Sequence, residues 1–111
     1  MILRVHKRGK DIVVAACDED ILDKTFKCGE LRIHVSSKFY GNETGEEGDL
    51  ILALRSCSSA NLVGRETIEI AIRSGFIQRD GVIQIGEIPH AQLFKIPGQT
   101  HKGGKLRYSR T

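Results

Sequence analysis

The sequence of 111 residues has no long apolar run, and this absence excludes one class of protein at once. None of its hydrophobic stretches approaches the roughly 18 to 20 residues that a membrane-spanning helix needs. The apolar start Met1-Ile2-Leu3 is also too short for a signal peptide, because the charged residue Arg4 follows it directly. We therefore expect a cytoplasmic protein with no membrane partner.

Cysteine is scarce, and the sequence lacks the spacings of a metal or phosphate site. Cys17, Cys28 and Cys57 are an odd set without a Cys-x-x-Cys pair, which argues against disulfides and against a zinc knuckle. We interpret them as small apolar residues in or near the core. No metal is predicted, because neither the cysteines nor the histidines have ligand spacing (His6, His34, His90, His101). No cofactor is predicted either, since no Gly-rich run ends in Lys and Ser or Thr.

Acidic residues are absent from both ends of the chain. Residues 1–10 contain four basic and no acidic side chains, and residues 88–111 contain five basic and none acidic. The central residues 11–87 hold the other 8 basic and all 14 acidic side chains, so that the net charge is +3. We expect a polyanion to approach the termini and to be repelled by the centre.

The periodicity of the apolar residues predicts strands and helices in alternating groups. The strongest pattern runs from Asn61 to Ile77, where Ile68, Ala71, Ile72 and Gly75 recur at helical spacing. Asn61 or Gly64 is its expected N-cap, and Gly75 is expected to end the helix in the left-handed conformation. The other predicted elements are strands over Ile2–His6 and Ile12–Cys17, a short helix capped by Asp18, a strand over Leu31–Val35, a helix capped by Thr44 and Glu47 with the apolar face Leu50, Ile51, Leu54 and Cys57, and strands over Val82–Ile85 and Ile88–Ile96.

These elements predict an α+β fold. We expect a mostly antiparallel sheet of about five strands, with the helix pair and the one short helix on one face. Residues 1–96 form a single compact domain in this interpretation. Residues 97–111 contain Leu106 as their one aliphatic side chain after Pro97, so we expect them to be a basic, flexible tail.

Two loop features are candidates for a site. Phe39 and Tyr40 are adjacent aromatics in the polar loop from Ser36 to Gly45, where they either plug the loop into the core or form a platform for a ligand. His90 follows Pro89, and Cys57 and Ser58 are conceivable partners for it in nucleophilic catalysis. The alternative is that His90 caps a strand or forms a local hydrogen bond.

Several segments together resemble a known family. The hairpin followed by CDEDILDKTF, the loop SSKFYGNE, the segment SSANLVGRE and the strand GEIPHAQLFKI resemble the archaeal domain-of-unknown-function family 424 over about residues 1–96. The resemblance implies an archaeal cytoplasmic protein for which RNA binding or a link to translation is suspected. It also directs attention to the turns and loops that it covers, at Phe39, Tyr40, Asn61, Gly64, Pro89, His90 and Gln92.

The charge pattern favours RNA binding without catalysis. Lys and Arg side chains without nearby carboxylates suit phosphate, and Tyr108 between Arg107 and Arg110 can stack on an unpaired base. We expect rRNA or tRNA as partner, in the ribosome or the translation apparatus and next to ribosomal proteins, without DNA specificity. The residues predicted to bind RNA are Lys7, Arg8, Lys10, Lys95, His101, Lys102, Lys105, Arg107, Tyr108 and Arg110.

Two other classes of function compete with RNA binding. The acidic centre of the chain suits a module that binds a basic protein partner. Phe39, Tyr40, Asn61, His90 and Gln92 are a candidate pocket for a small-molecule enzyme, which requires that these residues meet in space.

Overall fold

The computed structural model describes residues 1–96 and confirms the α+β class. In chain order the elements are β1 (Ile2–Arg8), β2 (Asp11–Cys17), the 3-10 turn η1 (Glu19–Ile21), β3 (Thr25–Cys28), β4 (Leu31–His34), α1 (Ser37–Tyr40), α2 (Glu47–Ser56), β5 (Ser59–Val63), α3 (Arg65–Arg73), the 3-10 turn η2 (Arg79–Gly81), β6 (Ile83–Ile85) and β7 (Ile88–Phe94). No helix in these described residues is long and apolar enough to cross a membrane.

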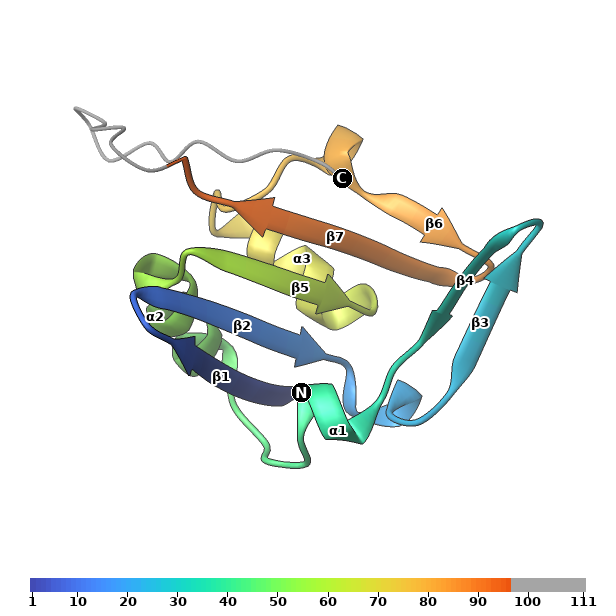
Figure 1. The fold of residues 1–111 in the computed structure, drawn as a ribbon. Coiled ribbons are helices and arrows are strands. Elements are labelled where there is room, and N and C mark those ends of the chain that lie inside the picture. The colour runs from blue at the N-terminus through green and yellow to red at the C-terminus, as the bar shows by residue number, and fades with distance from the viewer. Residues whose placement is uncertain (97–111) are drawn as a thin grey trace.

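Five strands form the main sheet in the order β1-β2-β5-β7-β6 (Figure 1). The predicted hairpin of β1 and β2 is confirmed, with Arg8 opposite Asp11 at its turn. β5 is parallel to β2 and antiparallel to β7, so the sheet is mostly antiparallel with one parallel pair. The two predicted late strands, β6 and β7, both exist and pair antiparallel.

The centre of the sheet corrects the strongest sequence prediction. Residues 61–63 belong to the central strand β5, and the helix begins only at Arg65, after the N-cap Gly64. Ala60, Leu62 and Val63 are fully or almost fully buried, as expected for a strand covered on both faces. The end of the helix was predicted correctly, because Gly75 has a φ of 82° and the amide of Phe76 returns to the carbonyl of Ala71.

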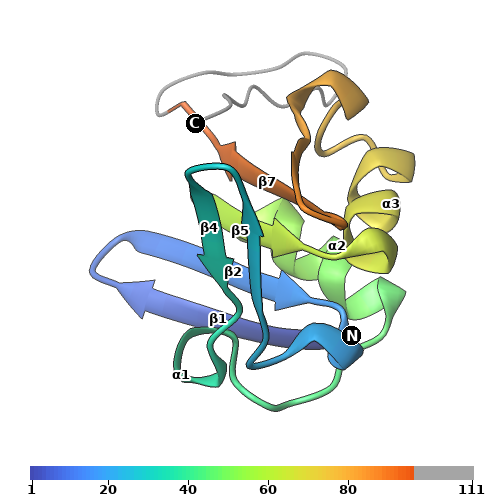
Figure 2. The same cartoon turned by 90° about the vertical axis from the view of Figure 1, so that its right-hand side faces the viewer.

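The helix pair α2 and α3 covers one face of the sheet (Figure 2). Leu50 and Leu54 of α2 and Ile68 and Ala71 of α3 pack with inward residues of the strands in one hydrophobic cluster. Cys57 is buried in this cluster too. The predicted capping pair of α2 was two residues off, because the reciprocal bonds join Glu46 and Asp49, while Thr44 forms a bridge to Ile2.

The opposite face is partly covered by smaller elements. The ribbon β3–β4 stands at one end of the sheet (Figure 1), and the single-turn helix α1 lies on the side away from α2 and α3 (Figure 2). Phe26 and Tyr40 of these elements, and Val35 between β4 and α1, pack with Cys17 and Val63 in a second hydrophobic cluster. The strand predicted over Leu31–Val35 therefore exists, but it belongs to this separate ribbon. Its partner β3 was not predicted.

Asp18 has a role different from the predicted one. Its side chain makes no capping bond to the short turn η1 that follows it. The carboxylate instead accepts hydrogen bonds from the backbone amides of Glu66 and Thr67 at 3.0 and 2.8 Å, and from the Thr67 hydroxyl at 2.8 Å. It thereby caps α3 from a segment 48 residues earlier in the chain.

Candidate nucleic-acid interface

The face of the main sheet that points away from α2 and α3 is only partly covered, and we call it the open face. Side chains alternate between the faces of a strand, and Ala15, Cys17 and Val63 pack on the side of α1 and the ribbon. Every second residue before and after them on the same strand therefore points to this side as well. The exposed or half-buried side chains of the open face are Arg4, His6, Arg8, Asp11, Val13, Ser59, Asn61, Ile83, His90, Gln92 and Phe94.

A polar row crosses the middle of the open face. The strand register places Arg4 opposite Ala15, Ala15 opposite Asn61, and Asn61 opposite Gln92. The Nε2 group of Gln92 donates a hydrogen bond of 2.8 Å to Oδ1 of Asn61. At the near end of the row, the Arg4 guanidinium lies against the backbone of Gly41 and donates to the Lys38 carbonyl. Three side chains from distant segments are thus held in one line.

The two predicted loop aromatics have different roles. Tyr40 is 4% exposed and acts as the plug, and burial raises the pKa of its hydroxyl well above the ordinary value. Phe39 is half-buried and stacks on the imidazole of His6, with ring centroids 5.0 Å apart and planes within 9°. A hydrogen bond of 2.8 Å between the Nε2 atom of His6 and the carbonyl oxygen of Phe39 fixes the position of the His6 ring. The pair forms an aromatic column on the open face.

His90 lies on the open face, away from Cys57 and Ser58. It is opposite Val63, and burial lowers the pKa of its imidazole below the ordinary value. The conceivable partners are elsewhere, since Cys57 lies in the helix-side cluster and the Ser58 hydroxyl accepts from the Ile12 amide. Neither of the two conceivable partners therefore lies beside His90.

The candidate pocket of the sequence analysis is an open surface in the structure. Asn61, His90 and Gln92 lie on the neighbouring strands β5 and β7, as predicted for residues of one site. The Phe39 ring stacks over β1, three strand spacings from β7, which is on the order of 14 Å. These residues therefore share a face but lie in two separate groups.

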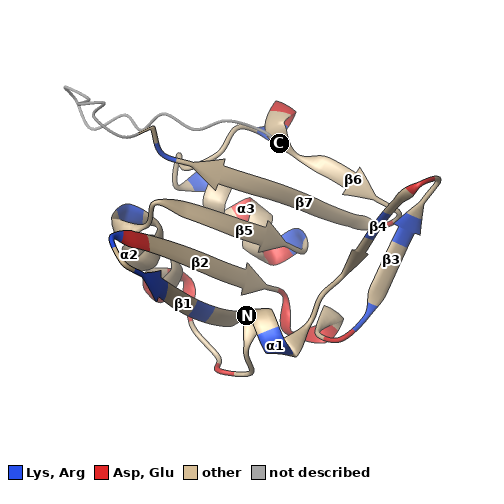
Figure 3. Cartoon of the chain, in the orientation of Figure 1, with Lys and Arg blue, Asp and Glu red and all other residues tan. Residues whose placement is uncertain are grey.

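The charges of the sheet are almost all positive. Asp11 is the only acidic residue within the five strands, which also contain Arg4, Lys7 and Arg8. Figure 3 shows β5, β6 and β7 free of charged residues, and acidic residues on α2, α3 and the turns. On the helix side two of the acids pair with arginines, Glu47 with Arg73 at 2.7 Å and Glu69 with Arg79 at 2.8 Å.

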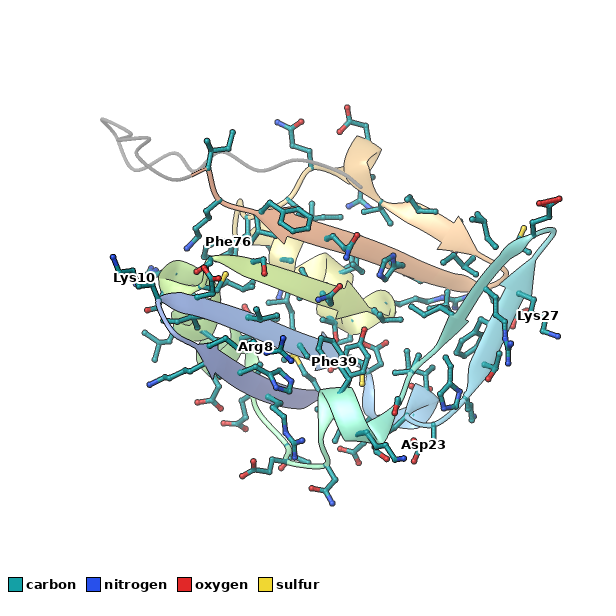
Figure 4. All side chains as sticks on the ribbon, viewed as in Figure 1. Arg8, Lys10, Asp23, Lys27, Phe39 and Phe76 are labelled. Atoms are coloured by element: carbon teal, nitrogen blue, oxygen red, sulfur yellow. The ribbon has the colours of Figure 1, made fainter. Side chains whose placement is uncertain are left out.

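The residues predicted to bind RNA are only partly brought together. Lys7, Arg8 and Lys10 lie at or beside the exposed β1–β2 turn; Arg8 projects over the open face, as Phe39 does, whereas Lys10 points outward (Figure 4). Lys95 makes contacts of a different kind, because its ammonium donates to the Leu54 and Arg55 carbonyls at 2.7 Å and caps the end of α2. The other predicted residues, His101, Lys102, Lys105, Arg107, Tyr108 and Arg110, lie outside the described residues.

The cysteines and histidines do not gather into a metal site in residues 1–96. No group of three or more His, Cys, Asp or Glu side chains there is arranged to hold an ion. Cys17 and Cys57 are buried, as predicted, and burial raises the pKa of the Cys17 thiol to about 12. Cys28 is exposed on the ribbon, contrary to the prediction of a core position.

Arg4, His6 and Phe94 are open-face residues that the sequence analysis did not select. Arg4 and His6 alternate with Leu3 and Val5 along β1, and this pattern already placed them on one face. The local sequence does not show which residues of β2 and β5 lie beside Arg4 and His6, because that depends on the register between the strands. Phe94 was counted only as part of a strand.

Comparisons with known proteins identify a family and a similar structure. A family model described as "Protein of unknown function (DUF424)" matches residues 5–96. No curated protein matches the chain at a significant level. The crystal structure of an uncharacterized conserved protein from the archaeon Methanopyrus kandleri is similar, with a TM-score of 0.75 and 24% sequence identity over 93% of this chain and 97% of that one. At this identity the similarity establishes the fold alone.

Proposed function

Since the chain belongs to the DUF424 family, we propose that it binds RNA without catalysing a reaction, and that the open face and the β1–β2 turn form the contact surface. The observation that carries this proposal is the open face itself. An aromatic column, a polar row and the Arg8 side chain share one surface of a sheet that contains one acidic residue.

Each feature of this surface matches a chemical part of single-stranded RNA. Unpaired bases stack on aromatic rings and offer their edges to amide and guanidinium groups, whereas phosphates require cations. A flat sheet presents such groups at regular spacing. The column of His6 and Phe39 suits a base, the amides of Asn61 and Gln92 suit a base edge, and Arg8 with Lys10 suits phosphate.

The competing functions find less support in the structure. An enzyme built around His90 needs a nucleophile or an acid beside it, and the two conceivable partners, Cys57 and Ser58, are directed elsewhere. A module for a basic protein would use exposed acids, and two of those on the helix side, Glu47 and Glu69, are paired with arginines. The association with the ribosome or translation remains a prediction that rests on the family resemblance, as does the role of residues 97–111.

Salt-dependent RNA binding tests the proposal. The affinity of the full chain for a fluorescent single-stranded RNA is measured by anisotropy over a range of salt concentrations. Each phosphate contact contributes about −0.7 to the slope of log affinity against log salt. Arg8→Ala is expected to weaken binding and to reduce this slope by about 0.7.

Two further variants separate the open face from net charge. Arg55→Ala removes an exposed cation from α2 on the other side of the sheet, so it is expected to leave the slope unchanged. Phe39→Leu keeps an apolar side chain against the core but removes the stacking surface, which is worth about 1 to 3 kcal/mol for each stacked base. Equal effects of Arg8→Ala and Arg55→Ala, or binding that does not depend on salt, contradict the proposed surface.

A further inference from the structure

Phe94 is an aromatic side chain outside the hydrophobic core. It is half-buried on the open face, opposite Ser59, and it packs into neither of the two hydrophobic clusters of the described residues. Gln92 lies two residues earlier on the same strand and the same face, so the two side chains leave the sheet about 7 Å apart. That separation is comparable to the length of a nucleobase.

The amide pair beside Phe94 has unused hydrogen-bonding capacity. The bond from Gln92 to Asn61 uses one proton of Gln92 and the oxygen of Asn61. Within residues 1–96 it leaves the Asn61 amide nitrogen as a donor and the Gln92 oxygen as an acceptor, next to each other. No buried side-chain nitrogen or oxygen in this part of the chain lacks a partner, so these two groups are accessible to solvent and to a ligand.

A neighbouring donor and acceptor can pair with the Watson–Crick edge of any base, but adenine presents a complementary donor and acceptor on its other edge as well. The 6-amino group of adenine donates, and either N1 or N7 beside it accepts. A purine also offers the larger surface for stacking on an aromatic ring. Burial lowers the pKa of His90, so that near neutral pH the adjacent side chain adds no charge that would favour a different base.

We propose that Asn61, Gln92 and Phe94 form a recognition site for one unpaired adenine of a bound RNA. The base stacks on Phe94, its 6-amino group donates to the Gln92 oxygen, and its ring nitrogen accepts from the Asn61 amide. This inference rests on the proposed RNA binding and adds a base preference to it. The site is separate from the His6–Phe39 column, which lies over β1.

A double-substitution cycle tests the hydrogen bond from the base. The full chain is titrated with a short oligoadenylate and with the same oligomer in which purine, which lacks the 6-amino group, replaces adenine. We expect the wild type to bind the adenine oligomer about fivefold more tightly, the value of one hydrogen bond. Gln92→Leu removes the acceptor at nearly constant volume, and we expect it to bind both oligomers with equal affinity.

A second variant and a free nucleotide complete the test. Asn61→Asp keeps the acceptor for Gln92 but removes the donor, so we expect it to lose the preference for oligoadenylate over oligouridylate. This variant also keeps the test usable if Gln92→Leu misfolds. Thermal unfolding shows whether Gln92→Leu is folded. Free AMP is expected to compete only far above the oligomer concentration. If AMP competes as well as the oligomer, the site serves a free nucleotide and the RNA assignment is overturned.

The outcomes also separate this site from RNA binding as such. If the wild type binds no RNA, the proposed function is wrong and the adenine site is wrong with it. If the wild type binds both oligomers equally, RNA binding stands and the adenine site is refuted. If Gln92→Leu retains the wild-type preference for adenine, the amide pair is not the group that reads the base.

Discussion

Replacing Asp18 by alanine is expected to destabilise the domain strongly, although this side chain is only partly buried. The Asp18 carboxylate accepts three hydrogen bonds at the start of α3, from the amides of Glu66 and Thr67 and from the Thr67 hydroxyl. It also fills the space that a Cβ atom on Gly64 would need. Asp18→Ala thus removes the cap of α3 and leaves a void at the turn between β5 and that helix.

The expected loss in the free energy of unfolding follows from the three hydrogen-bond donors that no longer have the Asp18 carboxylate as their acceptor. Loss of an N-cap side chain costs about 1 kcal/mol. Thr67 is fully buried, so its hydroxyl then lacks a partner in the interior, at an additional cost of about 1 to 3 kcal/mol. The total of about 2 to 4 kcal/mol is a large part of the 5 to 15 kcal/mol that is typical of a domain.

Urea denaturation followed by circular dichroism measures this loss as a change in the free energy of unfolding. Asp18→Asn keeps an oxygen for the Thr67 donors, and we expect it to cost about 1 kcal/mol. Asp20→Ala is the matched control, because it removes a neighbouring exposed carboxylate without a hydrogen bond to α3. If Asp18→Ala and Asp20→Ala destabilise the domain equally, long-range capping by Asp18 is refuted.

Two further predictions concern Lys95 and His90. Lys95→Met removes the cation from the last carbonyls of α2, so urea denaturation should show a loss of about 1 kcal/mol in the free energy of unfolding. The salt dependence of RNA binding should stay unchanged. A reduced salt slope would mean that Lys95 contacts phosphate. Burial lowers the pKa of His90 in the folded protein below its ordinary 6.5, so the unfolded chain binds this proton at higher pH. Its contribution to stability is therefore complete above about pH 6.5 and declines below it, by at most about 1.4 kcal/mol per pH unit. His90→Gln should flatten this part of the stability profile between about pH 8 and pH 5, and an unchanged profile would contradict the assignment to His90.

The elements that were predictable from the sequence are those whose signals are local. The β1–β2 hairpin has a β-branched run after a turn at Gly9, and its turn places Arg8 directly opposite Asp11. The end of α3 is marked by Gly75 and by two apolar residues that fold back, Phe76 and Ile77. In these cases the residues that cause the structure lie within one turn of it, so their pattern is sufficient.

The strand β5 was not predictable in the same way, because its stability comes from its neighbours. Ser59, Ala60 and Asn61 have little preference for a strand. The strand exists because β2 and β7 hydrogen-bond to it on both sides. Likewise the cap of α3 comes from Asp18 and not from a residue beside the helix. Tertiary contacts override local preference at both positions.

This correction also produces the candidate site. If Asn61, rather than the alternative Gly64, were the N-cap of the helix, its side chain would bond to its own first turn and be unavailable to a ligand. As a residue of β5 it projects from the open face and meets Gln92, which is 31 residues later in the chain. A shift of one residue in the β5–β7 register would turn Gln92 towards the helices and put Leu93 on the open face. The polar row therefore depends on the register of the central strands, which buried Leu62 and Leu93 fix from the opposite side of the sheet. The core residues of β5 and β7 therefore do more than stabilise the fold, because they determine which side chains the open face presents.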